Sequence, residues 1–482
     1  MIVLKFGGTS VADAARVGDA ASIIEAQPQP RAAVVSAASG VTNLLLDAAR
    51  AAAVRQQDRV AEIVARIHAK HHAIAAAIPD DHERSGALAE LDRLHAALAE
   101  ALGAVASAGQ LSSRDSDRIV ATGEKALSVL TAATLRSRGT PAAHVFADRV
   151  IATDGRHGSA RPDRARTRAN AQALLRPLLD EGTTVVMTGF IGCAPDGATT
   201  TLGRGGSDYS ATLLGAALDA DEVQIWTDVP GVLSADPRQV PGARVVPQVS
   251  YEEAQELAHF GAKVLHPRTI RPAVRRGIPV RILSTFAPHE PGTLVTRHSA
   301  GDHVKAVTAL RGLILLTIDV PELEDLAGAA ADAFRVLHED GVEVAFAAQA
   351  SSRRRMTYLV DALTGGCAGL LPRLEEALAD FDAEIGCTQD VAVVAAVGEG
   401  AASRPRGLAK MLAVLGRNSI PVLAASQQDS NVALLAAVPD AQANRAIAAL
   451  HEHLVPVQRG NGHARGRRPR RSALMAEPVR FG

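Results

Sequence analysis

The sequence predicts an α/β protein in which a mainly parallel sheet, covered by helices on both faces, is followed by two small α+β modules. Up to about residue 295, apolar strand-like segments alternate with helical segments and are separated by glycine-rich turns, as in parallel sheets. The chain has 482 residues, whereas a single core rarely grows past about 250–300 residues. After about residue 300 a shorter alternation of strands and helices occurs twice, which indicates two further modules.

Two units at the N-terminus share one plan of strand, glycine turn and helix. In the first, Ile2–Phe6 is apolar and β-branched, Gly7–Ser10 forms the turn, and Val11–Glu25 has apolar residues at helical spacing. In the second, Ala32–Ala37 has the composition of a buried strand and Leu44–Arg55 that of a helix. Such consecutive units favour parallel neighbours in one sheet.

The rest of the first domain, which we place at residues 1–297, adds a helical insertion and further strands. From about residue 57 to 135, alanine, leucine and charged residues recur at helical spacing, with breaks at Pro79 and Gly109. Strands are expected at Thr184–Thr188, Val223–Thr227 and Val280–Leu283. The insertion therefore interrupts an otherwise regular α/β plan.

The C-terminal part is divided by pattern into modules at residues 304–380 and 381–457. We expect strands and helices at Gly312–Val320, Leu323–His338, Val342–Ala348, Met356–Ala362, Pro372–Asp380, Ala383–Cys387, Val391–Val397, Gly407–Arg417, Pro421–Ala425, Val432–Val438 and Ala441–Leu454. Residues 458–482 are rich in arginine, glycine and proline and poor in apolar residues, a composition typical of a disordered tail.

The overall charge gives no reason to expect a nucleic acid or a membrane as partner. Lysine and arginine together number 51 against 52 acidic residues, for a net charge of −1. The N-terminus shows no basic, apolar and small-residue pattern of a leader peptide, and no apolar run approaches a membrane span. We expect a soluble, cytoplasmic protein.

The number and spacing of the cysteines also favour a cytoplasmic protein. The three cysteines, Cys193, Cys367 and Cys387, form no CxxC pair and have no histidine at zinc-ligand spacing. We therefore expect neither a zinc site nor a disulfide framework, in keeping with a reducing cytoplasm.

The first glycine turn has the features of an anion site. Lys5 precedes Gly7 and Gly8, which follow a strand and open a helix, where free backbone N–H groups and the helix dipole favour a phosphate. Such turns are also common without a ligand. The spacing matches neither a Walker A loop nor the GxGxxG of dinucleotide-binding proteins.

Three other turns carry polar groups whose role is open on their own. Ser36 and Thr42 flank a second strand-to-helix turn, and Glu124 follows Gly123 near a helix start. Ordinary helix capping explains these residue types equally well. Phe190, in GFIG at 189–192, follows a strand at the edge where open α/β sheets place ligands.

The segment TLGRGGSDYSA at 201–211 supplies the recognition chemistry. Arg204 suits bidentate binding of a carboxylate, Ser207 offers a hydroxyl, and Asp208 suits an ammonium. Together these groups favour an amino acid over a neutral sugar as ligand. Lysine occurs at only six positions. Lys5, just before the Gly7–Gly8 turn, and Lys263, in FGAKVLHP, suit phosphoryl transfer by positioning and charge neutralisation.

The motifs in combination resemble the aspartate kinases of the amino acid kinase family. They are KFGGTSV at 5–11, VVSAASGVTNLL at 34–45, GE at 123–124, GFIG at 189–192, TTTLGRGGSDYSA at 199–211, WTDVPG at 226–231 and FGAKVLHP at 260–267. The helical insertion resembles that of the longer aspartokinases, and the C-terminal pair resembles tandem ACT modules of βαββαβ plan. The resemblance implies an amino acid kinase-like αβα sandwich.

The resemblance assigns roles residue by residue. It implies catalytic roles for Lys5, Asp208 and Lys263. It implies aspartate binding by Ser36, Thr42, Glu124, Phe190, Arg204 and Ser207, with Asp208 also at the ammonium. It implies nucleotide binding by Lys5, Gly7, Gly8, Thr227, Asp228, Asp236, Arg238 and Lys263. Mg²⁺ is expected on ATP oxygens and water, with no metal site built by the protein.

The implied activity is ATP-dependent phosphorylation of the β-carboxylate of L-aspartate to 4-phospho-L-aspartate, the first step toward lysine, threonine and methionine. Alternatives are a glutamate or acetylglutamate kinase of the same fold and a catalytically idle amino-acid sensor. The family's ACT modules imply a homodimer and a lysine or threonine effector. In the family a hydrophobic or aromatic residue commonly packs near position 233; here it is Leu233, so ring stacking on the nucleoside is absent there. The chain departs from the pattern in the first module, at 320–325 and 351–355.

Overall fold

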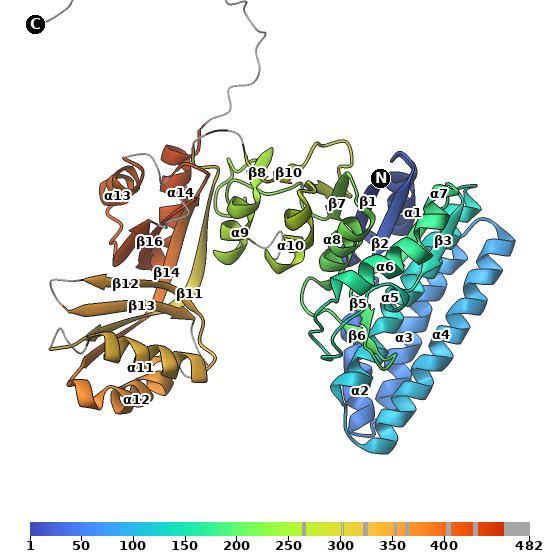
Figure 1. Cartoon of the computed structure of the whole chain (residues 1–482), viewed down its shortest axis with the longest axis horizontal. Coiled ribbons are helices and arrows are strands. Elements are labelled where there is room, and N and C mark those ends of the chain that lie inside the picture. Colours follow the sequence, from blue (N-terminus) through green and yellow to red (C-terminus); the bar gives the residue numbers. More distant parts are fainter. Residues whose placement is uncertain are drawn as a thin grey trace, which may run out of the picture.

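The computed structural model describes residues 1–262, 267–299, 301, 303–321, 326–350, 354–361, 366–401, 406–427 and 432–456. Figure 1 shows an N-terminal region, built on one sheet, and a C-terminal region, built on another, with α9, α10, β8 and β10 between them. The arginine-rich tail predicted at 458–482 lies outside the described residues. Among the described helices, none is long and apolar enough to cross a membrane.

The N-terminal region is organised around an eight-stranded, mainly parallel sheet, as the sequence predicts. Its order is β3-β4-β2-β1-β7-β9-β10-β8, and the β9–β10 pair is antiparallel while the other pairs are parallel. The strands are β1 (Ile2–Phe6), β2 (Arg31–Val35), β3 (Ala142–Val145), β4 (Thr184–Thr188), β7 (Glu222–Thr227), β8 (Gln248–Ser250), β9 (Val280–Ser284) and β10 (Thr293–Thr296). A separate hairpin is formed by β5 (Ile191–Cys193) and β6 (Thr199–Thr201).

Helices cover both faces of this sheet, which confirms the αβα sandwich. Side chains alternate along the strands, so Val3 packs in one core and Leu4 in the other. One core receives α6 to α10 together with Ala121 of α5; the other receives α1 to α5. The helices are α1 (Ala14–Glu25), α2 (Val41–Ala53), α3 (Gln57–Ala76), α4 (Asp81–Ala108), α5 (Ser113–Ser137), α6 (Arg164–Leu174), α7 (Arg176–Asp180), α8 (Gly206–Leu218), α9 (Tyr251–His259) and α10 (Pro267–Arg276).

The predicted helical insertion consists of α3, α4 and α5. The break at Pro79 separates α3 from α4, and α4 ends at Gly109, whose φ of +68° caps the helix in the left-handed conformation. The last helix of the block, α5, also packs against β3 and β4. Its residues 119–124 and 126–135 are all buried. The insertion is thus joined to the sandwich through a helix that belongs to its layer.

The carboxyl ends of four neighbouring strands meet at one edge of the sheet. The Gly7 N–H donates to the carbonyl oxygen of Trp226 on β7 at 3.2 Å. The N–H groups of Ser36 and Gly189 donate to the carbonyl oxygens of the last residues of β1 and β2, at 3.1 and 2.8 Å. The turns that follow β1, β2 and β4 therefore begin side by side. Parallel sheets offer this edge to ligands.

The C-terminal region is one six-stranded antiparallel sheet of order β12-β13-β11-β14-β16-β15. Its elements are β11 (Ala306–Asp319), α11 (Leu326–Glu339), β12 (Val344–Ala350), β13 (Arg355–Asp361), α12 (Gly366–Ala377), β14 (Glu384–Val397), α13 (Gly407–Arg417), β15 (Ala424–Gln427), β16 (Ala433–Pro439) and α14 (Ala443–Leu454). The two segments expected at 383–387 and 391–397 form the single long strand β14.

The two α+β units are interlocked rather than consecutive. Val304 and Val307 pack with α13 and α14 in one core, whereas Ile314 and Leu316 pack with α11 and α12 in another. The long strands β11 and β14 pair along their length and contribute to both cores. The expected sequential division at residue 380 is therefore not how the side chains pack, because the first strand of the region completes the last unit.

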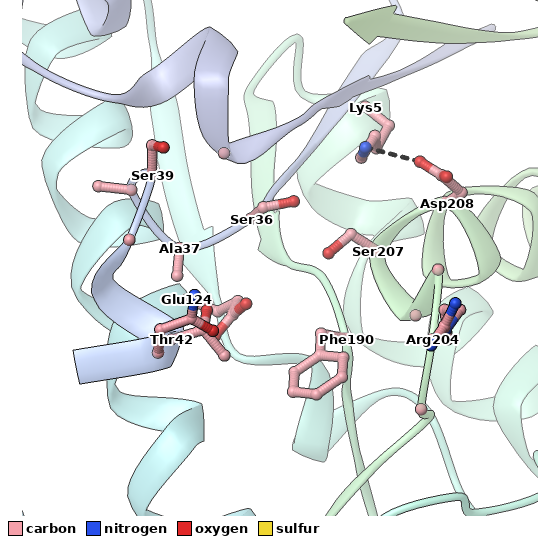
Figure 2. A pocket seen from close by; sticks show the side chains of 17 residues that line it. Lys5, Ser36, Ala37, Ser39, Thr42, Glu124, Phe190, Arg204, Ser207 and Asp208 are labelled. Atoms are coloured by element: carbon pink, nitrogen blue, oxygen red, sulfur yellow. Dashed lines mark ion pairs between the residues drawn. The ribbon is translucent and has the colours of Figure 1, made fainter. Parts of the chain in front are cut away.

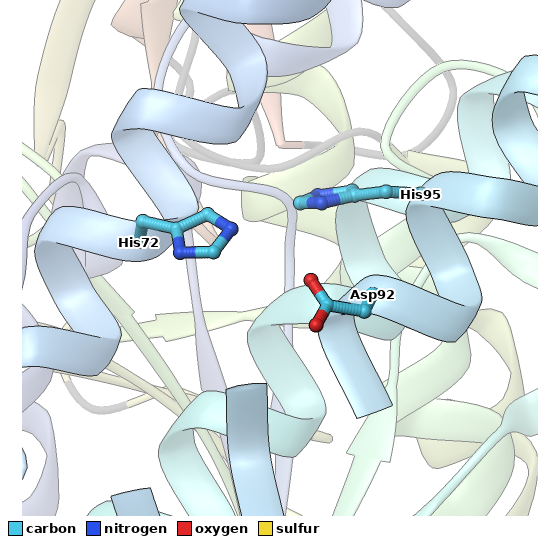
Figure 3. Close-up of side chains that lie close together, drawn as sticks. All are labelled: His72, Asp92 and His95. Atoms are coloured by element: carbon cyan, nitrogen blue, oxygen red, sulfur yellow. The ribbon is translucent and has the colours of Figure 1, made fainter. Parts of the chain in front are cut away.

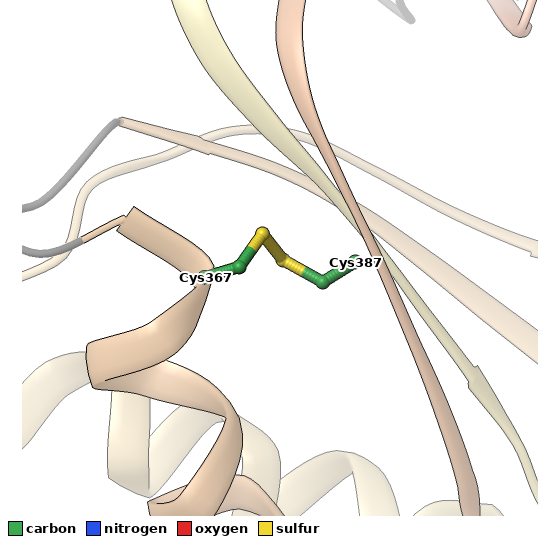
Figure 4. The surroundings of a disulfide bond; sticks show 2 residues. All are labelled: Cys367 and Cys387. Atoms are coloured by element: carbon green, nitrogen blue, oxygen red, sulfur yellow. A yellow bond between two sulfur atoms is a disulfide. The ribbon is translucent and has the colours of Figure 1, made fainter.

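The expectation of no disulfide is wrong. Cys367, in the first turn of α12, is bonded to Cys387 on β14, with the two Cα atoms 6.1 Å apart (Figure 4). The cysteines are 20 residues apart in sequence, and spacing alone does not reveal that α12 packs back on β14. Cys193 is free.

Candidate active site

A pocket of about 570 Å³ opens at the carboxyl edge of the large sheet. It brings together residues from four turns and from α5 and α8 (Figure 2). The predicted site residues that line it are Lys5, Gly8, Ser36, Thr42, Glu124, Phe190, Arg204, Ser207 and Asp208. The convergence on which the functional interpretation depends is therefore present in the fold.

Lys5 places a nearly buried positive charge in this pocket. It lies on β1 between β2 and β7, and the residue is 8% exposed. Its Nζ lies 2.6 Å from Oδ1 of Asp208, in the first turn of α8. The helix α8 begins at Gly206, so Ser207 and Asp208 are presented by its N-terminal turn. The helix dipole there favours an anion beside the ammonium.

Glycines allow the turns to approach one another. A Cβ on Gly8 would lie 2.9 Å from the carbonyl oxygen of Ala37, and one on Gly189 would lie 2.7 Å from the Cβ and Oγ of Ser207. Both distances are shorter than normal contacts. Any larger residue would push apart the turns that form the pocket.

Phe190 is held in an unfavourable backbone conformation at the pocket wall. Its φ is +70°, in the left-handed region that bulky residues rarely adopt. Its N–H donates to Oγ of Ser210 at 3.0 Å, and its carbonyl accepts from the N–H of Leu202 at 2.9 Å. Such conformations cost about 1–3 kcal/mol and are concentrated at functional sites.

Glu124 supplies a buried acid. It projects from α5, is 3% exposed, and its Oε2 has no hydrogen-bond partner among the described residues. Burial raises the pKa of this carboxyl to about 8. Backbone hydrogen bonds lower the pKa, but they offset the effect of burial only in part. Gly123 lets α5 approach closely, since a Cβ there would lie 2.7 Å from that of Ala37. An arriving ammonium would satisfy the unpaired oxygen.

Arg204 is exposed at the rim of the same pocket. It lies between Gly203 and Gly205, whose φ values of +78° and +69° form the tight turn before α8. In the view of Figure 2, Arg204 and Glu124 lie on opposite sides of the pocket. A guanidinium and a carboxyl so placed can bind the two ends of a zwitterion.

The predicted nucleotide-binding residues are only partly assembled here. Thr227 is the last residue of β7, the neighbour of β1, and Asp228 follows it; the Thr227 hydroxyl donates to Oδ1 of Asp228 at 3.2 Å. Asp236 and Arg238 instead line a second pocket of about 260 Å³, together with residues of β11. The Arg238 side chain is 88% exposed and pairs with Asp236 at 2.7 Å. Lys263 lies outside the described residues.

Asp117 is a supporting residue that the sequence did not reveal. It is 2% exposed and accepts hydrogen bonds from the Thr201 hydroxyl at 2.6 Å and from the N–H groups of Thr201 and Gly158. Its Oδ2 also lies 2.9 Å from Nδ1 of His157. These contacts fix β6 just before Arg204. In the sequence Asp117 is one charged residue within a helix and carries no distinguishing signal.

Comparison with known proteins decides the family. Residues 1–284 match the amino acid kinase family model, and residues 394–454 match an ACT domain model. The chain is 38% identical over 345 residues to lysine-sensitive aspartokinase 3 of Escherichia coli, covering 71% of this chain and 75% of that relative. This chain belongs to the aspartokinases of the amino acid kinase family. The resemblance drawn from the motifs is confirmed.

Other aspartokinases agree with this assignment. The aspartokinase of Thermus thermophilus is 34% identical over 346 residues, covering 70% of this chain and 83% of the relative. The structure of Escherichia coli aspartokinase III in complex with aspartate and ADP matches with a TM-score of 0.77 at 32% identity, covering 95% of this chain and all of that one. Aspartate kinase from Clostridium acetobutylicum, at 22% identity, shares the fold with a TM-score of 0.81.

Proposed function

We propose that this aspartokinase transfers the γ-phosphoryl group of ATP to the β-carboxylate of L-aspartate, giving 4-phospho-L-aspartate. The observation that carries the proposal is that Lys5 and Arg204 line one pocket. Asp208, in the first turn of the helix that follows Arg204, is paired with Lys5. The similar Escherichia coli structure is described as a complex with aspartate and ADP, which supports both ligands.

Aspartate binding is proposed for the side of the pocket that carries Arg204 and Glu124. The guanidinium of Arg204 would bind the α-carboxylate, and the Glu124 carboxylate would bind the ammonium. Phe190 lines the wall between these turns. The hydroxyls that would position the β-carboxylate are those of Ser36, Thr42 and Ser207.

Phosphate binding is proposed for the β1 end of the pocket. Lys5 would contact the transferring phosphate, while Gly7 and Gly8 allow main-chain N–H groups to approach it. Asp208 lies 2.6 Å from the Lys5 ammonium and holds it in place; in the substrate complex it would also face the aspartate ammonium. Charge neutralisation there lowers the barrier to attack by one anion on another.

The donor set fits an ATP-bound Mg²⁺ ion rather than one bound by the protein. Of the two pocket carboxylates, Asp208 is paired with Lys5 and Glu124 is buried. Mg²⁺ retains water and phosphate oxygens as ligands, and when bound with ATP it would supply further charge neutralisation. For the nucleoside itself we propose Thr227, Asp228, Asp236, Arg238 and Lys263.

The C-terminal region is proposed to regulate the enzyme as a homodimer. Its β-sheet ends in the edge strands β12 and β15, which offer unpaired backbone groups to a second copy. A lysine or threonine effector is proposed from the ACT match and from the similar Escherichia coli structure described as a complex with lysine and aspartate. Sedimentation and inhibition assays with each amino acid test these two proposals separately.

A hydroxamate assay with aspartate, glutamate and N-acetylglutamate tests the function directly. We expect product with aspartate; product only with another acceptor would establish a different carboxylate kinase, and no product with any would support a sensor. Lys5→Ala should lower kcat by about 100-fold or more while changing ATP binding little. Lys410→Ala, exposed on α13, is the matched control. A Lys5→Ala enzyme with near-normal kcat would refute the assignment.

A further inference from the structure

The hairpin of α3 and α4 carries a cluster of imidazoles that has no role in the proposed function. His68, His71 and His72 occupy positions i, i+3 and i+4 of α3, and Asp92 and His95 occupy i and i+3 of α4. Residues at these spacings lie on one face of a helix. The two faces meet where α3 packs against α4.

The side chains of this cluster are in direct contact. The ring of His95 stacks on that of His68 with centroids 3.7 Å apart, and Nδ1 of His71 lies 3.0 Å from Nε2 of His95. One ligand atom from each of His72, Asp92 and His95 lies within 4.8 Å of the other two (Figure 3). Three donor groups on two helices therefore converge on one point.

Packing alone does not account for these residues. His71 is fully buried and His95 is 5% exposed, yet Nε2 of His71 and of His68 lack hydrogen-bond partners among the described residues. An unsatisfied buried polar group is destabilising. Neighbouring core positions of the same helices are Ile67 and Leu91, so an apolar side chain would fill this space without that cost.

The cluster combines donor types that bind transition-metal ions. The imidazoles of His72 and His95 lie beside the carboxylate of Asp92. A carboxylate beside two imidazoles adds the negative charge that a divalent ion requires.

We propose that His72, Asp92 and His95 form a binding site for a divalent transition-metal ion of the zinc class, separate from the nucleotide-associated Mg²⁺. Imidazole donors select Zn²⁺, Co²⁺ or Ni²⁺ over the oxygen-preferring Mg²⁺. With ligands at about 2.0–2.1 Å in tetrahedral geometry, donor atoms lie roughly 3.3 Å apart. Because the present separations are at most 4.8 Å, the donor atoms must approach by no more than about 1.5 Å, which the exposed Asp92 is free to do. A water molecule or His68 would complete the coordination.

The site lies where it can stabilise one wall of the substrate pocket. Lys70, next to His71 on α3, donates from Nζ to the carbonyl oxygen of Ser39 at 2.7 Å, and Ser39 lines the active-site pocket. A metal ion that joins α3 to α4 would hold the helix that supports this turn. Its primary effect is on stability, with a smaller effect on the KM for aspartate.

The experiment uses the untagged full chain, stripped with chelator and titrated with ZnCl₂ by calorimetry and by thermal denaturation. We expect about one Zn²⁺ per chain and a higher Tm, with no Tm rise from MgCl₂. His72→Ala and Asp92→Ala should each weaken Zn²⁺ binding by about 10- to 100-fold or more. His82→Ala, an exposed histidine on α4, is the matched control and should bind as wild type.

Because His72 and Asp92 lie at the open side of the cluster, their variants test binding without removing the buried His71. Absence of stoichiometric Zn²⁺ binding would overturn the proposal and leave the imidazoles as packing groups. Binding that survives the His72→Ala/Asp92→Ala double variant would also overturn it, because the ion would then lie elsewhere. Aspartate kinase activity is not needed for either readout, so failure of this site is distinguishable from failure of the proposed function.

Discussion

Replacing Glu124 with glutamine keeps the size of this buried side chain but removes its ionisation. Burial raises its pKa from 4.5 to about 8, a difference of about 3.5 units, or roughly 5 kcal/mol at 1.36 kcal/mol per unit. The folded protein therefore binds the proton more tightly than the unfolded chain does. The corresponding stability is fully present below pH 4.5 and is lost as the pH rises to about 8.

The stabilities of the wild type and of Glu124→Gln should therefore depend differently on pH around neutrality. Between pH 6 and pH 7.5 the free energy of unfolding of the wild type should fall by about 2 kcal/mol more than that of Glu124→Gln. One extra bound proton in the folded state changes this free energy by about 1.36 kcal/mol per pH unit, over 1.5 pH units. Urea denaturation followed by the fluorescence of Trp226 measures this, because the single tryptophan lies on β7 of the same sheet. Glu62→Gln, exposed on α3, should track the wild type.

The same group links aspartate binding to proton release. With a pKa of about 8, roughly a tenth of Glu124 is ionised at pH 7 in the free protein, so binding of an ammonium should release about 0.9 proton. Titration calorimetry of aspartate in buffers of different ionisation enthalpy measures that number, and Glu124→Gln should release none. Parallel pH profiles for the two proteins, or wild-type binding without proton release, would refute the reasoning.

The other predictions concern packing around the site and in the C-terminal region. Gly189→Ala places a Cβ 2.7 Å from the first turn of α8 and should lower kcat/KM by about 100-fold; unchanged steady-state kinetics would contradict this. Lys305→Met removes the ammonium that lies 3.0 Å from the fully buried Glu253 carboxylate and should cost about 3–5 kcal/mol, seen as a lower Tm. The Cys367→Ser/Cys387→Ser variant loses a bond across 20 residues, worth about 3 kcal/mol. Reductant should lower the Tm of the wild type but not that of this variant.

Regular elements with strong local patterns were predictable from the sequence. The strands Ile2–Phe6 and Thr184–Thr188 and the helix Gly407–Arg417 have the expected bounds, because continuous apolar runs and helical periodicity depend on neighbouring residues alone. The strands β3, β5, β6, β8 and β10 were missed. Each has only three or four residues, too few to establish a period.

The chemical groups of the pocket were also visible in the sequence, since glycine turns at strand ends, scarce lysines and the GRGGSD segment indicate their function locally. The distances between these groups could not be predicted from the sequence. The ion pair of Lys5 with Asp208, the anchoring of β6 by Asp117 and the proximity of Cys367 to Cys387 all join segments distant in the chain.

The sequence by itself determined the α/β class, the family and most of the pocket residues, because these depend on short motifs and local periodicity. Only the tertiary structure decided how the two C-terminal units interlock, which acid is desolvated and which histidines of α3 and α4 converge. Those properties arise from the packing of one element against another, and the free energy of burying a charge or an imidazole depends on neighbours that the linear order of residues does not specify.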